Sequence, residues 1–308
     1  MAITIAVLSQ KGGTGKTTLT RSLADGLRRS GLETLAIDGD PQGNLSEYFG
    51  VSAEAYPTLG EVLTGRERAV DAIHDGVIPA NLGLAEAELI LAGKIGRELT
   101  LRNALREPKR QYDVVLIDCP PTLGLLTVNA LVAADWAILS TEAEHFSEQG
   151  AEQAMEVIAL ARENLNPDLE LLGILLNIAD MRTRHAKATL ETLRAEFGDK
   201  VFDTVIRRSI VYPESARAGK PIYEYNRRKA LDYARLTVEV LERLKLEEPL
   251  DLAREQLAEL EPAPRPDPPA RPEGPPEPSG QPDVEPEPSE TPPVTNGFDP
   301  GHTSYIKF

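Results

Sequence analysis

The chain has 308 residues, of which 41% are hydrophobic, so it can bury the core of one large domain or of two small ones. Its single cysteine, Cys119, excludes an internal disulfide and a cysteine-rich metal site and fits a reducing compartment. The formal net charge of −16 would disfavour a nucleic-acid partner, but residues 247–308 hold 14 Asp/Glu and 4 Lys/Arg, which leaves the first 246 residues at a net charge of only −6.

The sequence opens on a short apolar run, Ile3–Leu8. Neither a basic region nor a small-residue cleavage site accompanies this run, and it is far too short to span a bilayer. We therefore expect a buried strand in a cytoplasmic protein, without membrane association.

A glycine-rich loop, Lys11-Gly-Gly-Thr-Gly-Lys-Thr-Thr18, follows this run and leads into a helical segment that ends near Gly31. This order is typical of a P-loop, although Gln10 stands where the general pattern has its first glycine. The glycines let backbone N–H groups approach phosphate oxygens, and the helix N-terminus adds a positive dipole end. We expect Lys16 to contact the β- and γ-phosphates of ATP and the Thr17 hydroxyl to ligate Mg²⁺. The predicted nucleotide contacts in the loop are Lys11, Gly12, Gly13, Thr14, Gly15, Lys16, Thr17 and Thr18.

Acidic residues end the next two predicted strands, Thr34–Ile37 and Val114–Ile117. Asp38 and Asp40 follow the first strand, and Asp118 follows the second. Carboxyl ends of parallel strands meet at one edge of the sheet, where ligands bind in open α/β folds. Because Mg²⁺ needs an oxygen ligand beside the phosphate loop, Asp118 is a candidate metal ligand. For Asp38 and Asp40 a surface turn is the alternative interpretation.

The remaining apolar runs predict the fold class. Continuous runs of Val, Ile and Leu that alternate with helical periodicity are typical of strands buried on both faces. We expect a doubly wound, mostly parallel α/β sheet of P-loop NTPase type, with helices on both faces. The other expected strands are Trp136–Leu139, Leu171–Leu176, Val201–Val205 and a segment near Leu82–Ala85, which lies among short helical pieces at Thr58–Leu63, Glu86–Leu91 and Leu99–Leu105.

The composition changes near residue 247. Residues 247–308 hold 16 of the 25 prolines and most of the negative charge. Such a segment lacks the apolar surface that would offset the entropy cost of ordering it. The predicted organisation is therefore a P-loop ATPase domain at 1–246, a possible short helical extension at 247–261 and a disordered, acidic, proline-rich tail at 262–308.

A basic segment, Arg207–Lys229, reverses the sign of the charge, with a net charge of +5. Basic side chains on phosphates would give sequence-independent, salt-sensitive DNA binding, and a solvated basic face or contacts to nucleotide explain the charge equally well. Arg207 and Asn177 are candidate contacts to the adenine, and a capping role explains Asn177 as well. The candidate DNA contacts are Arg208, Arg217, Lys220, Arg227, Arg228 and Lys229.

Taken together, these motifs resemble the ParA/Soj family of deviant Walker A ATPases, within the ParA/MinD superfamily. The resemblance includes Asp38–Asn44, Asp118–Gly124 and Pro213–Pro221 and covers roughly residues 3–246. It implies that Lys11 contacts the nucleotide of the other subunit in an ATP-bound sandwich homodimer. It also implies that Asp40 orients the attacking water and that Asp38 supports the Mg²⁺ shell, so the catalytic candidates are Lys11, Lys16 and Asp40.

The same resemblance implies a slow chromosome or plasmid partition ATPase. Its ATP-bound dimer would bind double-stranded DNA of the nucleoid without sequence specificity, and a ParB-like adaptor would stimulate hydrolysis and release it. Three alternatives remain. A ParA-like ATPase can position a protein cargo; a MinD-like membrane regulator should end in a basic amphipathic helix instead of an acidic tail; and an ATP-dependent ligase of the dethiobiotin-synthetase type is disfavoured by the acidic motifs and by the lack of an obvious substrate insert.

Overall fold

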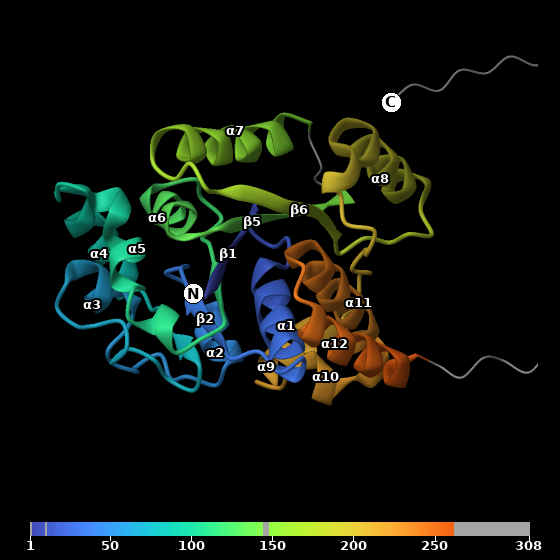
Figure 1. Ribbon diagram of the computed structural model, residues 1–308, viewed down its shortest axis with the longest axis horizontal. Coiled ribbons are helices and arrows are strands. Elements are labelled where there is room, and N and C mark those ends of the chain that lie inside the picture. Colours follow the sequence, from blue (N-terminus) through green and yellow to red (C-terminus); the bar gives the residue numbers. More distant parts are fainter. Residues whose placement is uncertain (1, 10, 144–147, 262–308) are drawn as a thin grey trace, which may run out of the picture. The chain divides into compact units, whose positions relative to one another are not determined.

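The computed structural model describes residues 2–9, 11–143 and 148–261. Its six strands form one parallel sheet in the order β3-β2-β4-β1-β5-β6, with helices on both faces (Figure 1). The predicted fold class, a doubly wound parallel α/β sheet, is confirmed. The expected tail at 262–308 lies outside the described residues.

Five of the apolar runs predicted as strands are strands. The strands are β1 (Ile3–Leu8), β2 (Thr34–Asp38), β3 (Val77–Ile78), β4 (Val114–Asp118), β5 (Trp136–Glu142) and β6 (Glu170–Asn177). Apolar residues along β1, β4 and β5 alternate between two cores, as the two-residue period of a strand requires. In β1, Ala6 and Leu8 pack in one core and Ile5 and Val7 in the other.

Helices from both ends of the chain cover the two faces. The core of Ala6 and Leu8 includes residues of α6 and α7, and the core of Ile5 and Val7 includes residues of α1, α11 and α12. None of the helices in the described part of the chain is both long and apolar enough to cross a bilayer. The helices are α1 (Lys16–Arg29), α2 (Asn44–Tyr48), α3 (Leu59–Thr64), α4 (Gly83–Ala92), α5 (Thr100–Ala104), α6 (Leu125–Ala133), α7 (Glu148–Asn164), α8 (Arg184–Phe197), α9 (Val211–Arg217), α10 (Ile222–Tyr225), α11 (Arg227–Leu244) and α12 (Glu247–Leu260).

The expected strand near Leu82–Ala85 is wrong. The Asn81 side chain accepts a hydrogen bond from the Gly83 backbone N–H at 2.9 Å, and helix α4 begins there. The strand of this region is the two-residue β3, which pairs with β2 and is fully buried. Two apolar residues are too few to show the alternation of a strand. In the longer apolar stretch that follows, the buried residues Leu84, Ala87 and Leu91 have the spacing of a helix.

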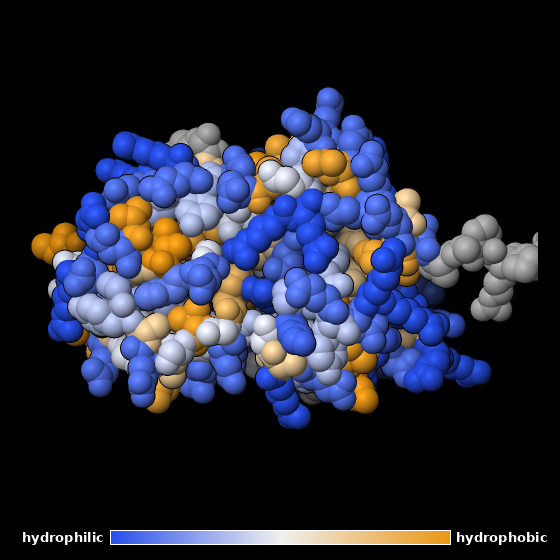
Figure 2. Space-filling view, turned by 90° about the horizontal axis from the view of Figure 1, so that it is seen from below, coloured by the Kyte–Doolittle hydropathy of each residue, from blue (hydrophilic) through white to orange (hydrophobic). Residues whose placement is uncertain are grey.

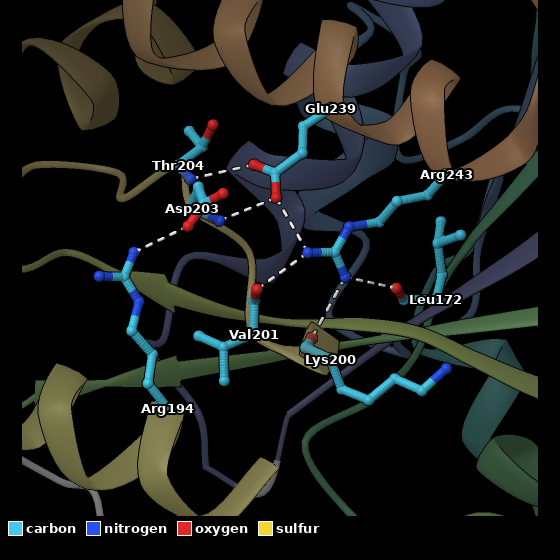
Figure 3. A network of polar contacts seen from close by, with 8 residues as sticks. All are labelled: Leu172, Arg194, Lys200, Val201, Asp203, Thr204, Glu239 and Arg243. Carbon is cyan, nitrogen blue, oxygen red and sulfur yellow. Dashed lines mark hydrogen bonds and ion pairs between the residues drawn. The ribbon is translucent and has the colours of Figure 1, made fainter. Parts of the chain in front are cut away.

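The expected strand Val201–Val205 is also wrong. Only Val201 forms a bridge with β6, opposite Ile174. Beyond it, the Glu239 carboxylate of α11 accepts the backbone N–H groups of Asp203 at 2.8 Å and Thr204 at 3.0 Å (Figure 3). A helix side chain therefore satisfies backbone donors that a neighbouring strand would otherwise satisfy.

Arg243, one helical turn after Glu239, completes this network. Its guanidinium donates to the carbonyls of Leu172 at 2.9 Å and Val201 at 2.8 Å and pairs with Glu239 at 2.9 Å. The same group lies 4.1 Å from the centroid of the Phe202 ring. One side chain thus joins the end of the sheet to α11.

Replacing Arg243 with methionine should destabilise the domain. The Arg243 and Glu239 side chains are only 21% and 14% exposed, so the variant leaves a largely buried carboxylate and two carbonyls without this partner. We expect the free energy of unfolding to fall by about 1–3 kcal/mol in urea denaturation. The matched control is Arg194→Met, since Arg194 pairs with Asp203 at the surface, and its effect should be below about 0.5 kcal/mol. Equal denaturation midpoints for the two variants would contradict this assignment.

Candidate functional site

The phosphate loop, residues 11–18, connects the carboxyl end of β1 to helix α1. Gly13 and Gly15 have φ angles of 87° and 75°, in the left-handed region that favours glycine. Gly15 is the N-cap of α1 and has no side chain to occupy the first backbone N–H groups of the helix. A Cβ atom added at Gly13 would meet nothing within 4 Å. The loop therefore presents free backbone donors to open space, as an anion site requires.

Asn177, at the end of β6, holds this loop in place by hydrogen bonds. Its amide nitrogen donates to the Thr14 carbonyl at 2.9 Å and to the Ser140 hydroxyl oxygen at 3.2 Å. A Cβ atom at Gly15 would lie 2.9 Å from that nitrogen, so this arrangement leaves room only for glycine. Its Oδ1 accepts the N–H of Ile178, a β-branched residue held at a φ of 51°. Both amide protons of Asn177 are thus engaged within the protein, and its contact with adenine stays a prediction.

Two acidic side chains lie side by side at the carboxyl edge of the sheet. Asp38 and Asp118 are partners in the register of β2 and β4 and are 0% and 1% exposed. The Thr17 hydroxyl donates to Asp118 at 2.7 Å. Burial, followed by the negative charge of Asp38, raises the pKa of Asp118 to about 7, although the Lys16 ammonium opposes this shift. The sheet thus pairs Asp38 with Asp118, and α1 brings Thr17 to Asp118, so the three predicted Mg²⁺ ligands are neighbours.

Asp38 organises the turn that follows β2. Its carboxylate accepts hydrogen bonds from the Asp40 N–H at 3.2 Å and from the N–H and hydroxyl of Ser46 at 2.8 and 2.7 Å. Burial nevertheless raises the pKa of Asp38 to about 6. Asp40 itself is half-buried, and one of its carboxylate oxygens accepts the Gln42 N–H at 3.0 Å. Asp38 therefore holds the turn, and Asp40 lies at the edge of the pocket.

A pocket of about 500 Å³ lies above the phosphate loop and accommodates phosphates and a cation by its chemistry. Lys16 is 7% exposed in its wall, and the buried Thr14 hydroxyl has no hydrogen-bond partner. Within the described ranges, no group of three His, Cys, Asp or Glu side chains could hold a metal. Thr17 and Asp118, which are hydrogen-bonded to each other, would offer a cation two oxygen ligands beside the loop. Lys11 lies exposed at the start of the loop. The other lining residues include Gly12, Gly13, Gly15, Thr17, Thr18, Asp40, Pro213, Ala216 and Arg217.

The structure divides the predicted basic segment between different surroundings. Arg217 of α9 lines the phosphate pocket, whereas the Arg207 guanidinium pairs with the Asp232 carboxylate at 2.6 Å. Arg227 donates to the Glu259 carbonyl of α12. Hydrophilic residues cover most of the face that α9 to α12 form (Figure 2). Of the candidate DNA contacts, Lys229 is half-buried and the exposed ones are Arg208, Arg217, Lys220, Arg227 and Arg228.

The fold adds neighbours that sequence reasoning did not single out. A parallel bridge joins Ala179, in the segment before α8, to Arg207 at the start of the basic segment. Arg184 and Lys187, in the first turn of α8, are exposed. In the sequence, the basic run at 182–187 could have indicated these two residues as candidates. A second, more apolar pocket of about 280 Å³ adjoins the phosphate loop. Its lining includes Gly13, Gly15, Ile178, Tyr212, Pro213 and Tyr233.

Replacing Asp118 with asparagine should stabilise the protein in the absence of nucleotide and Mg²⁺. A carboxyl group whose pKa is raised on folding favours the native state when protonated, so its contribution to stability is lost as the pH rises from about 4 to about 7. We expect the variant to unfold with a free energy about 1–3 kcal/mol above native at pH 8 and near native at pH 4. Asp168→Asn, a change at an exposed carboxylate, is the control. A native-like pH profile for Asp118→Asn would show that this carboxyl group is not strained by burial.

Comparisons with known proteins place the chain in a family. A family model described as an AAA domain matches residues 2–171. The chromosome-partitioning ATPase Soj of Thermus thermophilus is 42% identical over 245 residues, covering 78% of this chain and 96% of Soj. The chromosome partitioning protein ParA of Caulobacter vibrioides is 39% identical over 250 residues, covering 78% of this chain and 94% of ParA.

A solved structure gives the same fold. Cobyrinic acid a,c-diamide synthase from Mycobacterium smegmatis, with bound ADP and magnesium, is 33% identical with a TM-score of 0.70, over 80% of this chain and 96% of that chain. The phosphate loop, the paired carboxylates and the extent of these similarities lead to one conclusion: the chain belongs to the ParA/Soj family of P-loop ATPases.

Proposed function

We propose that this ATPase partitions DNA, by closing into a homodimer around ATP and Mg²⁺ and binding duplex DNA without sequence specificity. The main observation behind this proposal is that the phosphate loop and part of the basic segment line one pocket. Pro213, Ala216 and Arg217, which belong to the basic segment, line the same pocket as the phosphate loop. Nucleotide in that pocket would therefore contact the surface that we propose for DNA.

The phosphate pocket supports ATP and Mg²⁺ as ligands. Lys16 and the free N–H groups at the start of α1 suit the β- and γ-phosphates, and Thr17 and Asp118 supply oxygen atoms for the cation. The apolar pocket beside Tyr212 and Pro213 suits the adenine ring. When bound, the cation would neutralise charge on the phosphates and on the buried carboxylates.

In this proposal dimer formation depends on Lys11 and hydrolysis on Asp40. Lys11 is exposed at the start of the loop, and a second lysine there is free to reach the phosphates of a facing subunit. Asp40 lines the pocket, where the Asp38 turn holds it, and with ATP bound its carboxylate would orient the attacking water. In this proposal Lys11 makes dimer formation depend on ATP, and Asp40 makes the dimer transient.

The names of the relatives support a chromosome as the cargo. The relatives in Thermus and Caulobacter are named as chromosome-partitioning proteins. We extend that role to this chain, with the nucleoid as its location and a ParB-like protein as the partner that stimulates hydrolysis. A protein cargo in place of DNA would use the same nucleotide switch.

A second candidate is ATP-dependent amidation of a small molecule. It is favoured by the similarity to the Mycobacterium smegmatis synthase. The two candidates differ in what ATP promotes, since a ligase consumes ATP with its substrate and need not bind DNA. A direct DNA-binding measurement therefore separates them.

The first prediction of the partition proposal concerns Lys11. We expect the protein to bind a duplex of arbitrary sequence with ATP and Mg²⁺ but not with ADP, and the Lys11→Ala variant to lose this binding while it still binds ATP as a monomer. Fluorescence anisotropy of labelled DNA and sedimentation give the two readouts. Lys200→Ala, at an exposed lysine after α8, is the matched control. A native protein that hydrolyses ATP but binds no DNA under any condition would rule out DNA as the cargo.

A second prediction concerns the salt dependence of binding. If Arg228 contacts a phosphate, Arg228→Ala should weaken binding to all duplexes alike and reduce the slope of log K against log salt by about 1. Arg110→Ala, at an exposed arginine just before β4, should leave the slope unchanged. If both variants show the native slope, Arg228 does not take part in the DNA surface.

A further inference from the structure

A buried chain of hydrogen bonds joins the turn after β2 to the basic segment. Tyr48, the last residue of α2, is 1% exposed, and its hydroxyl lies 2.5 Å from the hydroxyl oxygen of Ser215 on α9. Ser215 is fully buried and donates to the Lys220 carbonyl at 2.8 Å. A serine hydroxyl has one proton, so the Tyr48 hydroxyl is the donor in the first bond. The chain therefore runs from Tyr48 through Ser215 to Lys220.

This series of hydrogen bonds connects two parts of the proposed functional site. In the middle of α2, Ser46 donates its N–H and hydroxyl to Asp38, the carboxylate paired with Asp118. At the far end, Lys220 is a candidate DNA contact and closes the turn that begins at Arg217, in the wall of the phosphate pocket. A five-residue helix is thus bonded to Asp38 through its middle residue and to the basic segment through its last residue.

A second contact joins the end of α2 to α1, the helix that follows the phosphate loop. Arg21, in the second turn of α1, is 8% exposed, and its guanidinium lies 3.8 Å from the centroid of the Phe49 ring. The same guanidinium pairs with Asp25 at 3.1 Å. A helix as short as α2 has little stability of its own, so these contacts determine its position. A displacement of the phosphate loop or of Asp38 would therefore move Tyr48.

We infer that Tyr48 is a positioning residue that transmits the nucleotide state to the basic segment. When ATP is bound, Tyr48 holds the turn from Arg217 to Lys220, through Ser215, in the conformation that binds DNA. This inference rests on the proposed function, and it adds the route by which ATP governs the DNA surface. The bond is made by the hydroxyl alone, so Tyr48→Phe removes the link and keeps the buried ring.

The test compares DNA affinity with ATP and with ADP for the full chain. The ratio of the two affinities should fall about fivefold or more in Tyr48→Phe and in Ser215→Ala. In the double variant this ratio should fall no further than in either single variant, because each substitution removes the same Tyr48–Ser215 hydrogen bond. Tyr223→Phe is the matched control, since its hydroxyl lies 3.4 Å from that of Thr237 on α11 and makes no bond to Ser215. Thermal unfolding of each variant reports any loss of stability separately.

A second readout does not depend on DNA. Hydrogen exchange of the amides in residues 211–225 should be slower with ATP than with ADP in the native protein, and Tyr48→Phe should abolish the difference. If the native protein binds DNA with ATP and Tyr48→Phe keeps the native ratio, the link is refuted and the proposed function stands. If the native protein binds no DNA, the proposed function fails. The hydrogen-exchange measurement then tests the link by itself, and an exchange difference between ATP and ADP that persists in Tyr48→Phe would refute the link.

Discussion

Two carboxyl groups that are buried side by side impose the main constraint on this site. Asp38 and Asp118 end paired strands, and burial raises the pKa of both. Without a cation, ionising both groups costs free energy through lost hydration and mutual repulsion. The groups nearby reduce that cost: Lys16 by its charge, and Thr17 and Ser46 by donating hydrogen bonds. A site that is destabilised when empty and stabilised by a cation with its phosphates suits a protein whose state changes with its nucleotide.

The parallel sheet makes this arrangement rigid. Its strands are buried on both faces, and alternate residues belong to different cores, so a strand cannot shift by one residue without moving apolar groups to the wrong layer. The loops at the carboxyl edge carry the groups that can move. Among them, the turn after β2 is tied to Asp38 and the phosphate loop to Asn177. Rigid strands with adjustable loops allow a small ligand to change the position of a distant surface.

Helix α11 organises the other half of the molecule. Glu239 and Arg243 bind the backbone of the segment after α8 in place of a sheet partner, and Asp232 pairs with Arg207. Asn226 caps the start of the same helix, next to Arg227 and Arg228. The segment that carries the positive charge is therefore held by one helix, and this helix packs against α1 behind the phosphate loop. Contacts on one helix thus affect both the fold and the proposed DNA surface.

The sequence by itself determined the features that depend on neighbouring residues. The apolar runs predicted five strands, the glycines predicted the phosphate loop, and the acids after β2 and β4 predicted the carboxylate pair, because each follows from local backbone geometry and burial. Only the tertiary structure decided what depends on residues far apart in the chain. Asp203 and Thr204 lie outside the sheet, where Glu239 of α11 accepts their N–H groups. Arg217 lies at the phosphate pocket because α9 packs there, and Tyr48 meets Ser215 across 167 residues. Such contacts arise from packing between elements, which no local pattern of residues encodes.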